Sequence, residues 1–166
     1  MNDHTVYLSI GSNLDPGNYL PKAILLLRQH GGIQAHSSAW ESKPVGSEGP
    51  NFLNACVLFL TLLATDEIKT RIVRPIESAL GRVRGPDKNT PRTIDIDPIL
   101  IDGNALRLDQ WESAFIVVPM AELAPALQHP ISREPMLRAA ARLSRSAWIQ
   151  PRPEVLSLTW LDVPAH

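Results

Sequence analysis

Apolar residues along this chain recur with two alternating periods. Short β-branched and aromatic runs at residues 5–10, 33–42, 52–62 and 93–101 have the length and composition of strands. Two longer segments between them place apolar side chains three or four residues apart, as the buried face of a helix requires. These side chains are Leu20, Ala23, Ile24 and Leu27 in the first segment, and Ile68, Ile72, Ile76 and Leu80 in the second.

The order strand, helix, strand, strand, helix, strand predicts an α+β fold with a ferredoxin-like βαββαβ core. The glycines at 31–32 and Gly81 are expected to end the two helices, because glycine accepts the left-handed backbone of a helix C-terminus. Thr65 and the two acids after it are expected to begin the second helix. Residues 43–50, with two prolines and two glycines, and the polar residues 82–92 are expected to be loops.

The last third of the chain adds elements to this core. The pattern predicts a short strand near Leu106, an apolar segment at 115–118, a helix at 135–143 and a last strand at 156–161. The sequence contains no internal repeat, low-complexity tract or linker. We therefore expect one domain over residues 1–166, with an additional C-terminal strand and helix.

Composition narrows the functional classes. Hydrophobic residues make up 44% and charged residues 20% of 166 positions, which is typical of a soluble globular domain. The net charge of -1 gives no electrostatic reason for binding nucleic acid or an anionic membrane. No signal peptide or membrane-spanning run is visible, so we expect a cytoplasmic protein without an obligate protein partner. The single cysteine, Cys56, lies in an apolar run and is expected to be buried.

Two carboxylates lie on one predicted strand. Side chains two residues apart on a strand point to the same face, so Asp95 and Asp97 should project together, opposite Ile94 and Ile96. Carboxylates this close repel each other, and a hard divalent cation relieves the repulsion. Mg²⁺ suits such a site because it takes one or two carboxylates together with phosphate oxygens. A solvated strand with an acidic face would have the same pattern.

Basic residues before this strand favour the metal interpretation. Arg82, Arg84, Lys88 and Arg92 fall within eleven residues that precede it. Cations beside a bound metal suit a polyphosphate, because each neutralises oxygens of the transferring group. The combination indicates a phosphoryl-transfer site. The G-x-x-x-x-G-K-[ST] loop and the glycine-rich kinase loop are absent, so neither of those classes is expected.

The sequence resembles the hydroxymethyldihydropterin pyrophosphokinases in five segments. Pro91 to Asp97, PRTIDID, is similar to the most specific signature of that family. The other segments are YLSIGSNL at 7–14, PVG at 44–46 with NFLNA at 51–55, GRVR at 81–84 and PMAELAP at 119–125. The resemblance implies a ferredoxin-like enzyme of folate biosynthesis that transfers diphosphate from ATP to 6-hydroxymethyl-7,8-dihydropterin and releases AMP.

The resemblance also implies roles for particular residues. Asp95 and Asp97 would hold two Mg²⁺ ions that bind with ATP, and together with Arg82 and Arg92 they are the expected catalytic residues. The expected ATP-binding residues are Glu77, Arg82, Arg84, Lys88 and Arg92, and the expected pterin-binding residues are Pro44, Val45, Gly46, Phe52, Asn54 and Phe115. ATP and a reduced pterin are the expected partners.

The segment after the acidic strand departs from the family pattern. Residues 108–115 are shorter than expected and lack a Pro-His pair, and Ser113 stands where the family usually has an arginine. Asn89 stands where a tryptophan is common. Two other interpretations stay open, and the shortened segment favours only the first. One is a paralogue that binds a pterin or a nucleotide with little or no transfer activity, and the other is a ferredoxin-like interaction domain without a small-molecule site.

Overall fold

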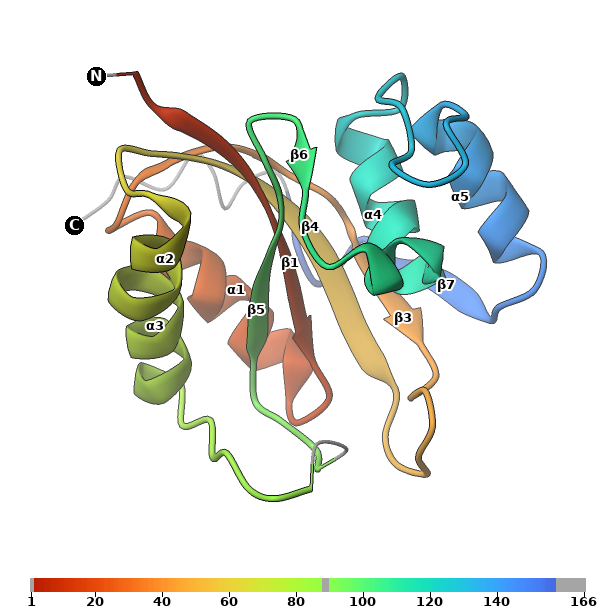
Figure 1. Ribbon diagram of the computed structural model, residues 1–166. Helices are drawn as coiled ribbons and strands as arrows, with labels where there is room; N and C mark the ends of the chain where they lie inside the picture. The colour runs from red at the N-terminus through yellow and green to blue at the C-terminus, as the bar shows by residue number, and fades with distance from the viewer. Residues whose placement is uncertain (1, 88–89, 158–166) are drawn as a thin grey trace.

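The computed structural model describes residues 2–87 and 90–157, and its centre is one antiparallel sheet. β1 lies between β4 and β5 (Figure 1), and the sheet order is β6-β5-β1-β4-β3-β7. β2 also pairs with β4. The described strands are β1 His4–Ser12, β2 Gly32–His36, β3 Ala39–Ser42, β4 Phe52–Thr61, β5 Asp95–Ile101, β6 Asn104–Ala105 and β7 Ile149–Arg152. This order confirms the predicted ferredoxin-like α+β core.

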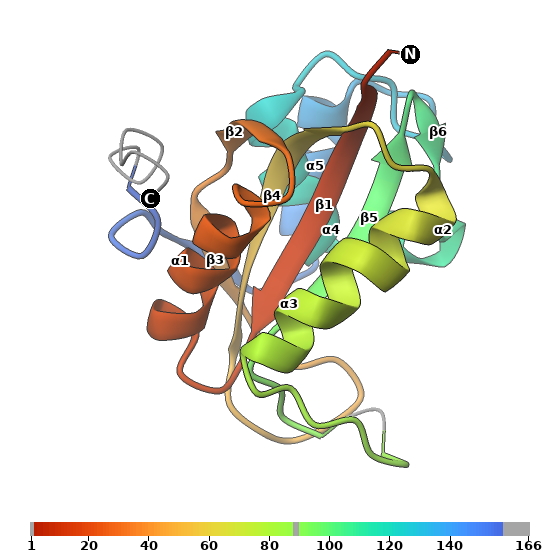
Figure 2. The same ribbon diagram turned by 90° about the vertical axis from the view of Figure 1, so that its left-hand side faces the viewer.

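Helices cover both faces of the sheet. On one face lie α1 (Pro16–Leu27) and the helical segment that contains α2 (Thr65–Glu67) and α3 (Arg74–Ala79). On the other face lie α4 (Ala114–Leu123) and α5 (Met136–Ser144), as the two views show (Figures 1 and 2). α4 contacts β4 and β3 but does not cover the start of β5. That end of the sheet stays open for a site.

Each helical layer has its own hydrophobic core. The stripes predicted for the first two helical segments are buried against Val6, Leu8 and Ile10 of β1 and Ile96 of β5. The second core joins the opposite face of the sheet to α4 and α5, and contains Cys56, Ile99, Trp111, Val117, Met120, Met136 and Leu143. Cys56 is buried as expected, and burial raises the pKa of its thiol.

The second helical segment is less regular than its spacing predicts. Thr65 is its first helical residue rather than its cap, and a π-helical turn at Ile68–Val73 separates α2 from α3. Pro75 has no N–H to donate to the carbonyl four residues back, which favours the wider turn before it. The Glu67 carboxylate accepts a hydrogen bond from the N–H three residues earlier. Gly81 follows at φ 77°, as predicted for a helix-ending glycine.

Residues 33–42, predicted as one strand, form the two strands β2 and β3. Both pair with β4, and they separate at Ser37 and Ser38. Glu122 of α4 accepts hydrogen bonds from the Ser38 N–H and the Trp40 indole N–H at this break. The one-strand prediction is wrong because a side chain from a distant helix binds the Ser38 N–H, a backbone group that a strand partner would otherwise bind.

The predicted C-terminal helix and strand are both present, but the strand lies at other residues than predicted. β7 pairs with β3 at residues 149–152, whereas the pattern placed the last strand at 156–161. Leu156 and Ser157 belong to no strand, and residues 158–161 lie outside the described residues. Strand β7 therefore extends the sheet edge next to β3.

Two smaller predictions are corrected in position. The strand expected near Leu106 is β6, which ends one residue earlier, and the apolar residues 115–118 lie inside α4. Within the described ranges, every helix is too short or too polar to cross a lipid bilayer.

Trp111 fixes the short connection between the sheet and α4. It lies in the 3₁₀-helix Leu108–Glu112 and is fully buried. Its indole N–H donates to the Leu106 carbonyl at 3.0 Å, and its own carbonyl accepts from the His129 ring at 2.6 Å. The two rings meet edge to face with centroids 6.0 Å apart. The shortened segment is therefore anchored at its centre.

Replacing Trp111 with alanine should lower the free energy of unfolding by about 3–5 kcal/mol, because a large buried ring is lost and a cavity remains. Urea denaturation followed by circular dichroism measures this. Trp148, whose side chain is 42% exposed, supplies the matched control, and Trp148→Ala should cost far less. Equal losses for the two variants would contradict the anchoring role of Trp111.

Candidate active site

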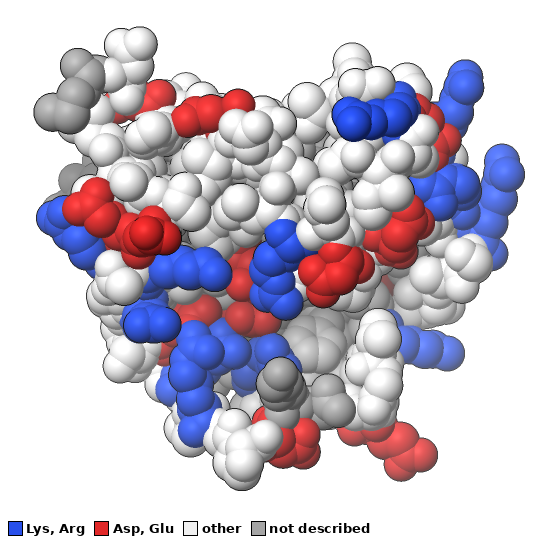
Figure 3. Space-filling model, viewed as in Figure 1, with Lys and Arg blue, Asp and Glu red and all other residues white. Residues whose placement is uncertain are grey.

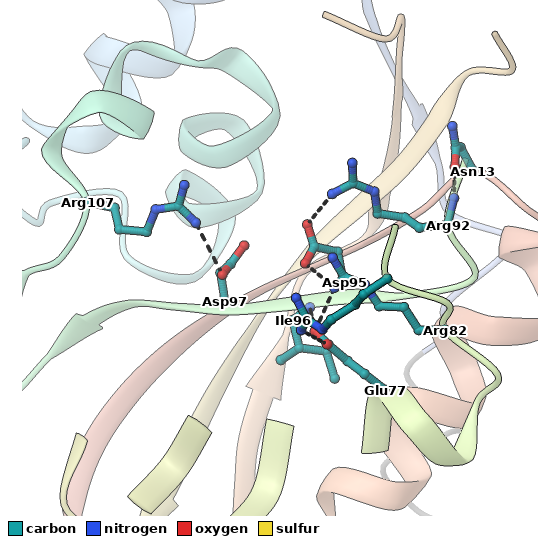
Figure 4. Close-up of polar contacts among 9 residues, drawn as sticks. Asn13, Glu77, Arg82, Arg92, Asp95, Ile96, Asp97 and Arg107 are labelled. Atoms are coloured by element: carbon teal, nitrogen blue, oxygen red, sulfur yellow. Dashed lines mark hydrogen bonds and ion pairs between the residues drawn. The ribbon is translucent and has the colours of Figure 1, made fainter. Parts of the chain in front are cut away.

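Asp95 and Asp97 project from the same face at the start of β5 (Figure 4). Ile94 and Ile96 are buried in the core on the opposite face, as the strand period predicts. β5 pairs with β1 through Asp97 and Ser9, and through Asp95 and Gly11. Both carboxylates therefore stand on rigid sheet rather than on a loop.

Two arginines hold Asp95. Arg82 Nη1 donates to Asp95 Oδ1 at 2.6 Å, and Arg92 Nη1 donates to Oδ2 at 3.1 Å. Burial opposes the charge of Arg82, but Asp95 and Glu77 outweigh it, and the pKa of Arg82 is raised. The Arg82 guanidinium therefore keeps its charge beside Asp95.

Glu77 of α3 holds Arg82 and Arg84 in place. Its side chain is only 3% exposed, and it accepts hydrogen bonds from Arg82 at 2.9 Å and Arg84 at 2.6 Å. The same carboxylate accepts the Ile96 N–H at 3.0 Å. Burial raises the pKa of Glu77, while the Ile96 N–H and Arg82 favour its charged form. Glu77 thus positions two arginines and joins α3 to β5 (Figure 4).

The ion pair that holds Asp97 is longer than the two that hold Asp95. Its ion partner is Arg107, whose Nη1 lies 3.4 Å from Asp97 Oδ1. Burial raises the pKa of Asp97, and the neighbouring Asp95 raises it further, whereas Arg107 and Lys69 lower it. The folded protein therefore places Asp97 where its charge is disfavoured.

Asn13 fixes the backbone at Arg92. Its Oδ1 accepts the Arg92 N–H at 2.7 Å, and its own N–H donates to the Arg92 carbonyl at 3.2 Å. The family resemblance included Asn13 in the segment at 7–14 without giving it a role of its own. Asn13 is 79 positions from Arg92 in sequence, so no local pattern could have found this contact.

One pocket lies on the β1 and β4 side of the carboxylates. Phe52 and Phe115 contribute rings to it, and the Arg92 guanidinium lies 5.9 Å from the Phe52 ring centroid. Asn54 is buried and donates to Ser42 Oγ at 3.0 Å. The lining residues are Ser9, Gly11, Ser42, Lys43, Val45, Ser47, Phe52, Asn54, Arg92, Asp95, Asp97, Gln110, Phe115 and Ile116.

Gly11 is required beside Asn54. A Cβ at Gly11 would approach Asn54 Oδ1 to 2.7 Å, which is too close for an unshifted side chain. The glycine therefore leaves room for the amide in the wall of the pocket.

A second, strongly charged pocket lies on the α3 side. Basic side chains surround the acidic ones across this part of the surface, as the space-filling view shows (Figure 3). Its polar lining includes Lys69, Arg74, Glu77, Arg82, Arg84, Asp87, Thr90, Arg92, Asp95, Asp97, Arg107 and Gln110. The two pockets share Arg92, Asp95, Asp97 and Gln110, so they meet at the carboxylates.

The structure brings most predicted site residues into these two pockets. Val45 lines the first pocket, but Pro44 lines a neighbouring hollow with Phe115, and Gly46 lines none of these. Lys88 lies outside the described residues, as does Asn89. Sequence reasoning missed Lys69, Arg74, Asn13 and Gln110.

The carboxylate pair fits a divalent cation that binds together with phosphate. Among the described residues, no three His, Cys, Asp or Glu side chains are grouped to hold a metal on their own. Asp95 and Asp97 supply two carboxylates, and Mg²⁺ commonly completes such a set with phosphate and water oxygens. The raised pKa of Asp97 shows a charge that a cation would stabilise.

The fold and the joined pockets define a ferredoxin-like α+β protein with a carboxylate-centred site between a basic compartment and an aromatic one. Residues 7–125 match the family model of 7,8-dihydro-6-hydroxymethylpterin-pyrophosphokinase. The chain belongs to that family.

Two curated relatives cover most of the chain. A 2-amino-4-hydroxy-6-hydroxymethyldihydropteridine pyrophosphokinase of Aquifex aeolicus is 35% identical over 80% of this chain and 88% of its own. The enzyme of the same name from Methylorubrum extorquens is 35% identical over 84% of this chain and 94% of its own.

Solved structures share the fold. A crystal structure of HPPK-DHPS in complex with substrates matches 88% of this chain with a TM-score of 0.66 at 13% identity. The match covers 44% of that longer chain. At this identity the likeness supports the fold alone.

Asp95 and Asp97 should respond differently to neutralisation. Asp97→Asn should raise the free energy of unfolding slightly, by about 0.2–1 kcal/mol, because it removes a like-charge contact. Asp95→Asn should lower it by about 1–3 kcal/mol, because two charge-assisted hydrogen bonds are weakened. Urea denaturation without divalent metal measures both changes. Equal shifts of the same sign would show that the arginines do not distinguish the two carboxylates.

Proposed function

We propose that this chain transfers the terminal diphosphate of ATP to the hydroxymethyl oxygen of 6-hydroxymethyl-7,8-dihydropterin, as a step of folate biosynthesis. The observation that supports this most strongly is the meeting of two chemically different pockets at Asp95 and Asp97. A flat heterocycle fits the aromatic compartment, and a polyphosphate fits the basic one. The reacting groups would then meet beside the carboxylates.

The aromatic compartment suits a pterin. Phe52 and Phe115 offer ring faces, and stacking contributes about 0.5–1.5 kcal/mol beyond the area buried. Asn54 is held by Ser42, and a fixed amide can recognise the alternating donors and acceptors of a pterin edge. Val45 and Ser47 close the pocket from the loop before β4. Pro44 and Gly46 act through the shape of that loop.

The basic compartment suits the ATP phosphates. Arg82, Arg84 and Arg92 are held near the carboxylates and can transfer their hydrogen bonds to phosphate oxygens. Lys88 adds charge to the same loop of the sequence. Two Mg²⁺ ions held by Asp95 and Asp97 would neutralise charge on the phosphates during the transfer. Glu77 keeps the arginines in place.

In the transfer, the hydroxymethyl oxygen forms a bond to the β-phosphorus of ATP. The bond between that phosphorus and the α,β-bridging oxygen breaks, and AMP leaves with its electrons. The hydroxyl proton passes to water. The chain binds and orients both partners and surrounds the negative charge with arginines, which lowers the barrier.

The inactive-paralogue interpretation is less favoured. It rested on the shortened segment at residues 108–115, which lacks the expected histidine and arginine. In the structure this segment is folded on Trp111 and brings Arg107 to 3.4 Å from Asp97. Arg107 thus supplies a cation beside the phosphate compartment. We also propose a cytoplasmic location for the activity.

The purified chain should release AMP, and not ADP, when incubated with ATP, Mg²⁺ and 6-hydroxymethyl-7,8-dihydropterin. Asp97→Asn should lower the rate at least about 100-fold while the protein stays folded, because one metal-binding carboxylate is lost. Asp66→Asn, at an exposed carboxylate on α2, is the matched control and should keep the wild-type rate. Chromatography of the nucleotides measures the products. Absence of AMP with the wild-type chain would contradict the proposed function.

Phe115→Ala should weaken pterin binding about tenfold and change nucleotide binding less than twofold, because the side chain lines only the aromatic compartment of the two. Arg84→Ala should show the opposite order, since Arg84 lines only the basic one. Isothermal titration with each ligand, using a non-hydrolysable ATP analogue, measures both. Parallel losses for both ligands in either variant would contradict separate compartments.

A further inference from the structure

Gln110 lies where the two compartments meet. It lines both pockets, as do Arg92, Asp95 and Asp97. The other three are charged, and Gln110 is the neutral member of the shared set. It belongs to the shortened segment, so its position does not follow from the motifs that carry the family resemblance.

The Gln110 side chain has an unsatisfied acceptor. Its Oε1 is buried and has no hydrogen-bond partner among the described residues. A buried polar atom without a partner costs about 1–3 kcal/mol, so a ligand group that reached this acceptor from either pocket would relieve that cost.

The backbone around Gln110 is fixed. Its N–H donates to the Arg107 carbonyl and its carbonyl accepts the Ser113 N–H, both at 3.0 Å. The next residue, Trp111, is fully buried and anchored through its ring and its carbonyl. The segment therefore holds the Gln110 backbone in place before any ligand arrives, so only the side-chain torsions are left to be ordered on binding.

We propose that Gln110 Oε1 accepts a hydrogen bond from the hydroxyl of the pterin's hydroxymethyl group and so orients the attacking oxygen. This role rests on the proposed function. An acceptor that holds the O–H leaves an oxygen lone pair free to face the β-phosphorus. An amide neither takes the proton nor adds negative charge beside the phosphates, which a third carboxylate would do. Gln110 is thus a positioning and specificity residue for the hydroxymethyl group.

The test uses Gln110→Leu, which keeps the approximate size and removes the acceptor. Gln150→Leu, at an exposed glutamine of β7 outside both compartments, is the matched control. Binding is measured for 6-hydroxymethyl-7,8-dihydropterin and for its 6-methyl analogue, which lacks the hydroxyl. Turnover, KM for each substrate and melting temperature are measured on the same proteins.

The wild-type chain should bind the hydroxymethyl compound about fivefold to tenfold more tightly than the methyl analogue, and Gln110→Leu should lose this preference. The variant's turnover should fall about fivefold to tenfold, with little change in KM for ATP. Its melting temperature should stay the same or rise, because an unsatisfied buried acceptor is removed. Gln150→Leu should match the wild type in all of these measurements.

A retained preference in Gln110→Leu, equal losses for both pterins, or a loss confined to ATP would overturn the role of Gln110. Should the leucine variant unfold, Gln110→Met, with a flexible unbranched side chain, provides the same comparison. Wild-type protein that makes no AMP refutes the proposed function itself. Active wild-type protein with an unaffected Gln110→Leu variant refutes only the role of Gln110.

Discussion

The site depends on the hydrogen-bonded ion network that joins Glu77, Arg82 and Asp95. Glu77 Oε1 accepts from both Arg82 and the Ile96 N–H, so one buried carboxylate connects α3 to the strand that bears the acidic pair. Burying a carboxylate is expensive unless it is fully paired, and here two guanidinium groups and a backbone amide pair it. Without this network, α3 would not hold its side of the basic compartment at a fixed distance from β5.

The network also lowers the repulsion among like charges in the ligand-free protein. Under the proposed function, the arginines that bind phosphate would repel each other in the free protein, and Asp95 and Asp97 would do the same. In the ligand-free structure Arg82 and Arg92 neutralise Asp95, and Arg107 faces Asp97. When a polyphosphate binds with its cations, the arginines can pair with phosphate oxygens and the carboxylates can pair with the cations. Such preorganisation spares much of the reorganisation that charge binding otherwise requires.

The sequence was sufficient for features that depend on local period. Strand alternation placed Asp95 and Asp97 opposite Ile94 and Ile96, and the four-residue spacing identified the buried helix stripes. Features set by distant partners were not predictable. The break between β2 and β3 depends on Glu122, which lies 84 positions from Ser38. Gln110 carries no motif, and only the folded segment brings it to both pockets.

The connection between the sheet and α4 begins with a strained turn. Arg107 adopts left-handed backbone angles, φ 50° and ψ 65°, which cost a non-glycine residue about 1–3 kcal/mol. That turn starts the 3₁₀-helix that carries Gln110, and it lets the Arg107 side chain reach Asp97. Burial of Trp111 offsets the strain, since a large buried aromatic contributes a comparable or greater amount. The polar groups at the boundary of the compartments are therefore supplied by a short, rigid connection, and their geometry is set before the substrates bind.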